Sequence, residues 1–250
     1  MSERRKHKDW FDRDCAVRLG EAVRANHAAF DVEGYADEIE HGVPALELKG
    51  RVALMARGLR ERLPDDYAKA AAILQASLGP PLEGETGMFT QGYWLMPVAR
   101  FVEEYGLTDW STSMDLNEAV TQRHTAEFAV RPFVEADPER TLERMREWTG
   151  SNSAHVRRLA SEGARPRLPW GKRLIMFIEK PEPILALVEP LKADPSAYVR
   201  KSVANLINDV SKDHPDRIRE LTERWSRDSD APETAWIVRH GTRTLRKSAP

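Results

Sequence analysis

A short phrase that recurs in the second half of the chain constrains the fold more than any other feature. Its first two copies lie 43 residues apart and a shortened third copy follows 39 residues later: SAHVRR at Ser153–Arg158, SAYVRK at Ser196–Lys201 and IVRH at Ile237–His240. A proline precedes each copy at a matching place, at Pro138, Pro181 and Pro215. This period, with a proline-led helix before a Val-Arg helix, is typical of an α-solenoid of helical pairs. We therefore expect the functional residues on a concave surface.

The composition is that of an ordinary soluble globular protein. The chain has 250 residues, 41% of them hydrophobic, and a mean hydropathy of -0.58, so it can bury a substantial core. Cys15 is the only cysteine, which excludes an intramolecular disulfide, and residues 1–8 are too polar for a signal peptide. No run approaches the roughly 18 apolar residues that a membrane helix needs. We expect a cytoplasmic location and no membrane partner.

Charge is divided unevenly along the chain. Residues 1–150 contain 19 Lys and Arg against 27 Asp and Glu, whereas residues 151–250 contain 19 against 13. The basic part is therefore the part that carries the repeat. A positive surface of this kind is the expected footprint of a polyanionic partner, because each phosphate that is neutralised releases counterions. The alternative is that the Arg-rich helices are simply solvated.

Apolar residues recur with helical spacing along nearly the whole chain, and no segment shows the sustained alternation of a strand. We predict an all-α protein with helices near residues 12–29, 46–63, 65–78, 93–105, 115–131, 138–149, 153–163, 170–192 with a break at Pro181 and Pro183, 196–211, 214–227 and 232–247. Residues 79–87 hold two prolines and three glycines, which prevent a helix. We expect one domain, 1–250, with an acidic helical cap at 1–78, a loop at 79–92 and a repeat region with a basic concave face at 93–250.

Glu127 stands out because it interrupts the apolar side of the helix predicted over 115–131. Asp115 and Glu118 resemble a capping box at the start of that helix, and at about 100° per residue Glu127 projects among the apolar side chains. A carboxylate there is costly to bury unless it is paired or used. Glu127 therefore either forms a surface pair with Arg123 one turn earlier or serves a function.

The helix over 153–163 carries a charged stripe that recurs in the later repeats. Arg158 and Glu162 lie one turn apart, away from the packing side, and Gly163 is expected to end the helix. The stripe continues through Lys201, Asn205, Asp209 and Lys212 in the second copy and through His240, Thr244 and Lys247 in the third. We expect Glu162 to face a surface and not the core. Such stripes either line one face with alternating charges or only keep it soluble.

Residues 165–173 combine cations with an aromatic ring. Pro166 and Pro169 prevent a helix, and Trp170 lies among the four cationic side chains of Arg165, Arg167, Lys172 and Arg173. Cations that hold phosphates beside a ring that stacks on bases or sugars are common in nucleic-acid binding. Trp170 could instead cover the helical core.

Five segments together identify a resemblance that covers nearly the whole chain. They are Leu46–Arg51, Leu63–Tyr67, Trp94–Pro97, Arg123–Phe133 (RHTAEFAVRPF) and His155–Trp170 (HVRRLASEGARPRLPW). The chain resembles the bacterial HEAT-like alkylpurine DNA glycosylases, specifically the AlkC branch of the AlkC/AlkD superfamily. The last two segments are long and specific. The resemblance implies a right-handed HEAT-like α-solenoid with an N-terminal helical cap. Many relatives add an immunoglobulin-like β domain, which we do not expect here.

The resemblance also implies an activity. It indicates a monofunctional DNA glycosylase that removes cationic N-alkylated purines, 3-methyladenine above all, from duplex DNA in base excision repair. Alkylation makes the base a good leaving group, so the protein has to stabilise an oxocarbenium-like sugar and position a water, for which carboxylates and aromatic faces are suited. The superfamily acts without flipping the base into a pocket, unlike most glycosylases. We expect no metal or organic cofactor, a monomer, and association with the bacterial nucleoid.

By motif position, the resemblance assigns roles to individual residues. Glu127 and Glu162 match the active-site carboxylates, Arg158 the residue that orders them or contacts the DNA backbone, and Trp170 an aromatic near the lesion, while Asp209 follows from Asn208-Asp209 alone. The expected DNA-binding cations are Arg123, Arg157, Arg165, Arg167, Lys172, Arg173, Arg200, Lys201, Lys212, Arg239 and Arg243.

Two other classes of function use the same surface. One is a noncatalytic HEAT-repeat protein that binds DNA or RNA structures, against which the retention of both Glu127 and Glu162 argues. The other is a protein-interaction adaptor whose basic stripe meets an acidic partner. Salt-dependent binding to duplex DNA separates the adaptor from the other two.

Overall fold

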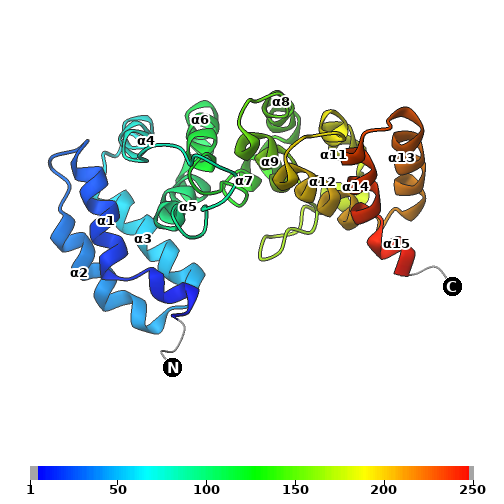
Figure 1. Ribbon diagram of the computed structural model, residues 1–250. Helices are drawn as coiled ribbons and strands as arrows, with labels where there is room; N and C mark the ends of the chain where they lie inside the picture. The colour runs from blue at the N-terminus through cyan, green and yellow to red at the C-terminus, as the bar shows by residue number, and fades with distance from the viewer. Residues whose placement is uncertain (1–4, 248–250) are drawn as a thin grey trace. The chain divides into compact units, whose positions relative to one another are not determined.

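The computed structural model describes residues 5–247, in which every regular element is a helix and no β-strand occurs (Figure 1). The chain divides into two compact units, Met1–Val130 and Arg131–Pro250. The predicted all-α fold is confirmed, whereas the single domain with boundaries at 78 and 92 stays a prediction. No helix within residues 5–247 is long and apolar enough to cross a membrane.

Within residues 5–130 the first unit contains six α-helices and four short 3-10 turns. They are α1 (Arg13–Arg24), α2 (Val32–Gly42), α3 (Leu48–Arg62), α4 (Tyr67–Ala76), α5 (Met96–Tyr105) and α6 (Trp110–Thr121), with 3-10 turns at His7–Trp10, Val43–Ala45, Tyr93–Leu95 and Gly106–Thr108. The sequence sets many helix starts locally, since Asp12, Asp31, Asp66 and Asp109 each accept a hydrogen bond from a first-turn backbone N–H. Successive helices pack on one another around fully buried side chains such as Leu19, Tyr35, Met55 and Phe101.

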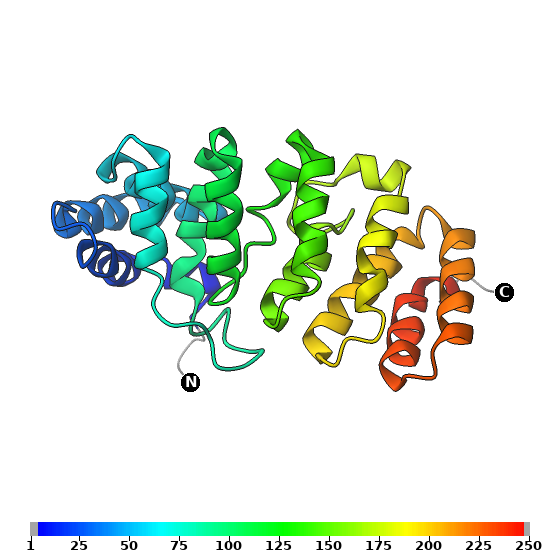
Figure 2. The ribbon, with the colours of Figure 1, turned by 90° about the horizontal axis from the view of Figure 1, so that it is seen from above.

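The second unit is built from repeated helical pairs (Figure 2). Its elements are α7 (Arg131–Ala136), α8 (Pro138–Trp148), α9 (Ala154–Gly163), α10 (Ile175–Glu179), α11 (Glu182–Val188), a 3-10 turn (Glu189–Leu191), α12 (Ala197–Val210), α13 (Pro215–Asp228), α14 (Pro232–Gly241) and α15 (Arg243–Lys247). The helices α9, α12 and α14, which contain the repeated phrase, pack in succession, and each follows a proline-led partner: α8, α11 or α13. The predicted helical repeat is confirmed, and its right-handed sense stays a prediction.

In the first two copies of the repeated phrase, the arginine has the same role inside its own repeat. Arg157 donates through Nη1 to the carbonyls of Ser151 and Asn152, and Arg200 donates in the same way to those of Asp194 and Pro195. In both copies the acceptors lie five and six residues before the arginine. The recurring Val-Arg therefore fastens the loop that enters the second helix of a pair.

The helix prediction is wrong for three segments and misses one helix. The helix predicted over 115–131 is α6, which begins after the Asp109 cap and ends at Thr121, so residues 122–130 form turns. The helix α2 lies where we predicted none. The stretch 170–192 contains only α10, α11 and a 3-10 turn, because the loop that holds Trp170 continues to Leu174, and 232–247 is divided at Thr242.

The loop at 79–92 is held against the turns that follow α6, all within the first unit. The backbone N–H of Leu82 donates to the carbonyl of Gln122 at 3.0 Å, Arg123 Nε donates to the Gly79 carbonyl at 2.6 Å, and His124 Nδ1 lies 2.9 Å from the Met88 carbonyl. This loop therefore supports the segment that leads to Glu127.

Gly92 is required at the base of this loop, and replacing it should destabilise the first unit. A Cβ at Gly92 would lie 1.8 Å from the carbonyl oxygen of Arg123, so the backbone would have to move, whereas a Cβ at Gly84 meets nothing within 4 Å. We expect Gly92→Ala to lower the free energy of unfolding by about 1–3 kcal/mol and Gly84→Ala to change it by less than about 0.5 kcal/mol. Urea denaturation measures both, and equal midpoints for the two variants would contradict the expectation.

Candidate active site and nucleic-acid interface

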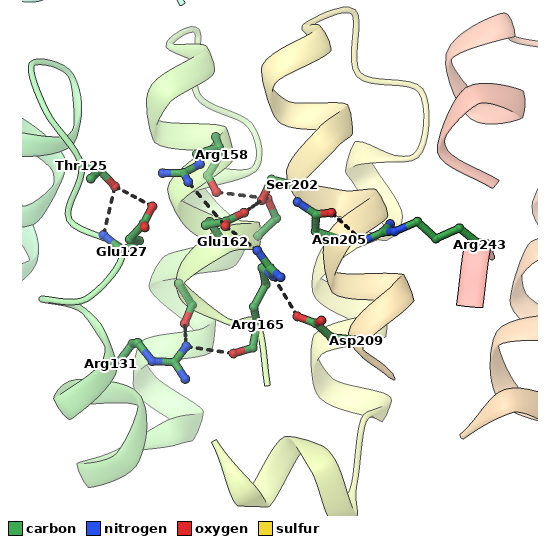
Figure 3. A network of polar contacts seen from close by, with 12 residues as sticks. Thr125, Glu127, Arg131, Arg158, Glu162, Arg165, Ser202, Asn205, Asp209 and Arg243 are labelled. Carbon is green, nitrogen blue, oxygen red and sulfur yellow. Dashed lines mark hydrogen bonds and ion pairs between the residues drawn. The ribbon is translucent and has the colours of Figure 1, made fainter. Parts of the chain in front are cut away.

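Glu162, on α9, is the centre of a buried polar network in the second unit (Figure 3). Only 6% of the residue is exposed. One carboxylate oxygen, Oε1, accepts a hydrogen bond from Arg165 Nη1 at 2.7 Å and lies 3.5 Å from Arg158 Nη2, while Oε2 accepts from Ser202 Oγ of α12 at 2.6 Å. Three side chains from two neighbouring helices and the following loop thus fix both oxygens.

Arg165 extends this network to a second carboxylate. Its Nε donates to Asp209 Oδ2 at 2.9 Å, and Lys212 Nζ lies 3.4 Å from the other oxygen of Asp209. Glu162, Arg165 and Asp209 are buried, and Arg165 donates to both carboxylates at once. Because isolated buried charges are very costly, the three residues are stable there only as a set.

The structure confirms one prediction about this helix and corrects another. The pair between Arg158 and Glu162 one turn apart is present. The expectation that Glu162 faces a surface is wrong, because Arg165 follows the end of α9 and covers it together with Ser202. The spacing of residues along one helix gives no information about Arg165, which follows the helix, or about Ser202, which lies on another helix.

The arginines keep Glu162 ionised. Burial by itself raises the pKa of a carboxyl group, but the charges of Arg158 and Arg165 and the hydrogen bonds from Ser202 and Arg165 outweigh it, so the pKa of Glu162 lies below its usual value of 4.5. At neutral pH Glu162 is therefore a fixed negative charge and not a proton donor.

This pKa shift predicts how Glu162 contributes to stability as pH changes. A carboxyl group whose pKa is lower in the folded state stabilises the protein above its unfolded-state value, and the contribution is lost as pH falls through the folded-state pKa. We expect the difference in free energy of unfolding between wild type and Glu162→Gln to be largest at neutral pH and to shrink below about pH 4.5. Denaturation at several pH values measures it, with exposed Glu85→Gln as the control; a difference that stays constant down to pH 3 would contradict the assignment.

Glu127 lies in the first unit, in the turns between α6 and α7, and 7% of it is exposed. Thr125 Oγ1 donates to Glu127 Oε2 at 3.0 Å and accepts from the Glu127 backbone N–H at 3.3 Å (Figure 3). The proposed helical pair with Arg123 is wrong, because Arg123 donates to the carbonyls of Gly79 and Ala119 and the segment is not helical. The local bonds with Thr125 set the direction of the carboxylate.

Trp170 is presented to solvent on a structured loop. It is 71% exposed and has a φ of 64°, in the left-handed region that residues with a Cβ rarely adopt. The loop closes through hydrogen bonds from Gly171 N to the Leu168 carbonyl and from Leu174 N to the Pro166 carbonyl. The alternative that Trp170 covers the core is therefore wrong, because most of the residue faces solvent.

The predicted DNA-binding cations fall into three groups by exposure. Lys172, Arg173, Lys201, Lys212 and Arg239 are exposed. Partly buried side chains with partners are Arg123, Arg157, Arg167, Arg200 and Arg243, of which Arg157 pairs with Asp194, Arg167 with Asp213, and Arg243 donates to Asn205. Arg165 is buried between two carboxylates, so its guanidinium is not presented to a phosphate. Contacts of these cations with DNA stay predictions.

Sequence reasoning missed Ser202 and Arg131. Ser202 occupies the position that Leu159 occupies one repeat earlier. A polar residue at a position that is apolar in the other repeat was the signal that could have identified it. Arg131 gave no signal of this kind. Within residues 5–247 no group of three or more His, Cys, Asp and Glu side chains is arranged to hold a metal ion.

The chain is similar to known proteins in both sequence and fold. The family model described as DNA alkylation repair enzyme matches residues 101–245. The chain is 39% identical over 241 residues to the uncharacterized protein YhaZ of Bacillus subtilis (strain 168). The matched region covers 96% of this chain and 64% of YhaZ. It also matches the structure of Pseudomonas fluorescens alkylpurine DNA glycosylase AlkC bound to DNA containing an abasic site analog, with 36% identity and a TM-score of 0.88 over 98% of this chain and 66% of that one. The chain thus spans about two thirds of the length of these relatives.

Proposed function

The chain belongs to the DNA alkylation repair enzyme family, and from that premise we propose that it is a monofunctional DNA glycosylase that excises cationic N-alkylated purines, 3-methyladenine foremost, from duplex DNA. The observation that carries the proposal is the buried network in which Arg165 and Ser202 hold an ionised Glu162 beside Asp209. A helix interface with only a structural role would gain more stability from apolar side chains than from one buried arginine and two buried carboxylates. The similarity to AlkC, which was solved on abasic-site DNA, supports the same conclusion.

The chemistry of the substrate fits what these residues can supply. In 3-methyladenine the base carries a positive charge, so when the bond between N9 and C1′ breaks, its electron pair neutralises the departing base. A cationic, oxocarbenium-like sugar remains, and water adds to C1′ with loss of a proton to leave an abasic site. Fixed negative charge stabilises such a cation, and its stabilising effect costs no reorganisation during the reaction.

We assign the roles accordingly. Glu127 and Glu162 supply negative charge near the sugar and position the water, Arg158 and Asp209 order the second carboxylate, and the face of Trp170 packs near the damaged nucleotide. Exposed cations such as Lys201 and Lys212 hold phosphates, and the base leaves without entering a pocket. The protein acts as a monomer.

The decisive experiment identifies the bases that the purified protein releases. Duplex DNA treated with a methylating agent is incubated with the protein, and the freed bases are separated by chromatography. Release of 3-methyladenine supports the proposal. If no base is released while the protein binds duplex DNA in a salt-dependent way, it is a noncatalytic DNA-binding protein, and if it does not bind DNA at all, a protein-interaction role replaces both.

A further inference from the structure

Arg131, at the start of α7, lies at a junction of three backbone segments in the second unit. Its Nη1 donates to the carbonyls of Gly163 and Arg165, both at 2.9 Å, and its Nη2 donates to the carbonyl of Lys172 (Figure 3 shows the first two). The residue is 5% exposed. One guanidinium therefore ties together the end of α9, the residue that binds both carboxylates, and the loop that presents Trp170.

Each of these three carbonyls belongs to a segment that the proposed reaction uses. Gly163 directly follows Glu162, and the side chain of Arg165 holds Glu162 and Asp209. Lys172 lies two residues after Trp170, whose left-handed backbone is costly unless the surrounding loop enforces it. Fixing the Lys172 carbonyl therefore restrains the position from which the tryptophan ring projects.

The chemistry of the contact requires an arginine. A guanidinium offers five N–H donors in a rigid plane, so it can meet three carbonyls in different directions, whereas a lysine ammonium is a point charge on a flexible stem. A Cβ on Gly171 would lie 3.4 Å from Arg131 Nε, so the loop backbone packs directly against the guanidinium. Arg131 therefore holds the loop both by hydrogen bonding and by direct packing against its backbone.

We propose that Arg131 is a positioning residue that fixes the Trp170 loop relative to the Glu162–Arg165–Asp209 network. It touches neither substrate nor reacting atoms in this role. The inference rests on the proposed glycosylase function for its effect on rate. Its effect on the loop can be measured without that function.

The rate test compares Arg131→Gln and Arg131→Lys with wild type under single turnover. Because loss of the clamp displaces groups that must be aligned, we expect excision to slow about 10–100-fold in both variants, while the Kd for duplex DNA with an abasic-site analogue changes by less than about threefold. The matched control is Arg51→Lys, a buried arginine of the first unit that also donates to two carbonyls, those of Leu46 and Lys8. It should keep the wild-type excision rate.

Limited trypsin digestion tests the clamp independently of catalysis. The side chains of Lys172 and Arg173 are exposed, so trypsin can recognise the bond between these residues. The carbonyl of this bond, however, accepts a hydrogen bond from Arg131. We expect cleavage between Lys172 and Arg173 to be about tenfold faster in both Arg131 variants than in wild type and Arg51→Lys, at a temperature where circular dichroism shows all four folded. If Arg131→Gln does not fold, Arg131→Lys carries the comparison.

The outcomes separate the two proposals. The positioning role would be overturned if the Arg131 variants were cleaved after Lys172 and excised the base at the same rates as wild type. It would also be overturned if the variants were less stable but both of these rates were unchanged. If wild type itself releases no base, the glycosylase proposal fails, and faster cleavage of the variants would still support the clamp.

Discussion

Glu162→Gln should excise 3-methyladenine about a hundredfold more slowly than wild type while remaining folded. Removing one unit of charge about 6 Å from a cationic sugar, at an effective dielectric constant of about 20, costs about 3 kcal/mol, which is about a hundredfold in rate. The fold should persist because a glutamine oxygen can still accept from Ser202 and Arg165 keeps its bond to Asp209. Single-turnover release of the base measures the effect.

Two further variants show whether the slower excision by Glu162→Gln is specific to the proposed active site. Glu127→Gln should also lower the rate sharply, because Glu127 is the other carboxylate assigned to the reaction. Glu189→Gln is the matched control: Glu189 accepts hydrogen bonds from Arg224, Lys192 and Trp225 in the same unit, but it lies in the 3-10 turn Glu189–Leu191 and joins that turn to α13. Wild-type release by both Glu127→Gln and Glu162→Gln would show that the residues are wrongly assigned.

The helices could be predicted where their signals are local. A proline at the first helical position marks α8 and α13, and the repeated Val-Arg marks α9 and α12. The helix α2 was missed although Val32, Tyr35, Ala36 and Ile39 have helical spacing, since Gly34 and Asp37 lower its intrinsic helix propensity.

The site was less predictable because its contacts are distant in sequence. Glu162 meets Ser202 across 40 residues and Arg165 meets Asp209 across 44, through the packing of α9 on α12. Glu127 was expected to project among the apolar side chains of a helix, but that helix ends at Thr121. The turns that contain Glu127 are held instead by the loop at 79–92. Motif similarity selected the candidate residues, and the pair between Arg158 and Glu162 followed from their spacing. The other partners of Glu162 and Asp209 became known only from the coordinates.

Arg165→Met should cause the largest loss of stability among the site variants. The substitution leaves two carboxylates, Glu162 and Asp209, with side chains 8% and 4% exposed and without the guanidinium that joins them. Breaking a buried ion pair by removing one partner costs about 3–5 kcal/mol, because the remaining charge stays desolvated. Urea denaturation at neutral pH measures the change in free energy of unfolding.

Arg167→Met is the control for this loss, since it removes a similar contact at the surface. Arg167 binds Asp213 through two nitrogens, but both side chains are about one quarter exposed, and such pairs contribute about 0–1 kcal/mol. The sign of the pH effect adds a second check. Without Arg165 the pKa of Glu162 rises in the folded state, so acid relieves the penalty and the deficit of Arg165→Met should narrow as pH falls from 7 toward 4. Equal losses for the two variants, or a deficit that does not depend on pH, would mean that the buried carboxylates do not depend on Arg165.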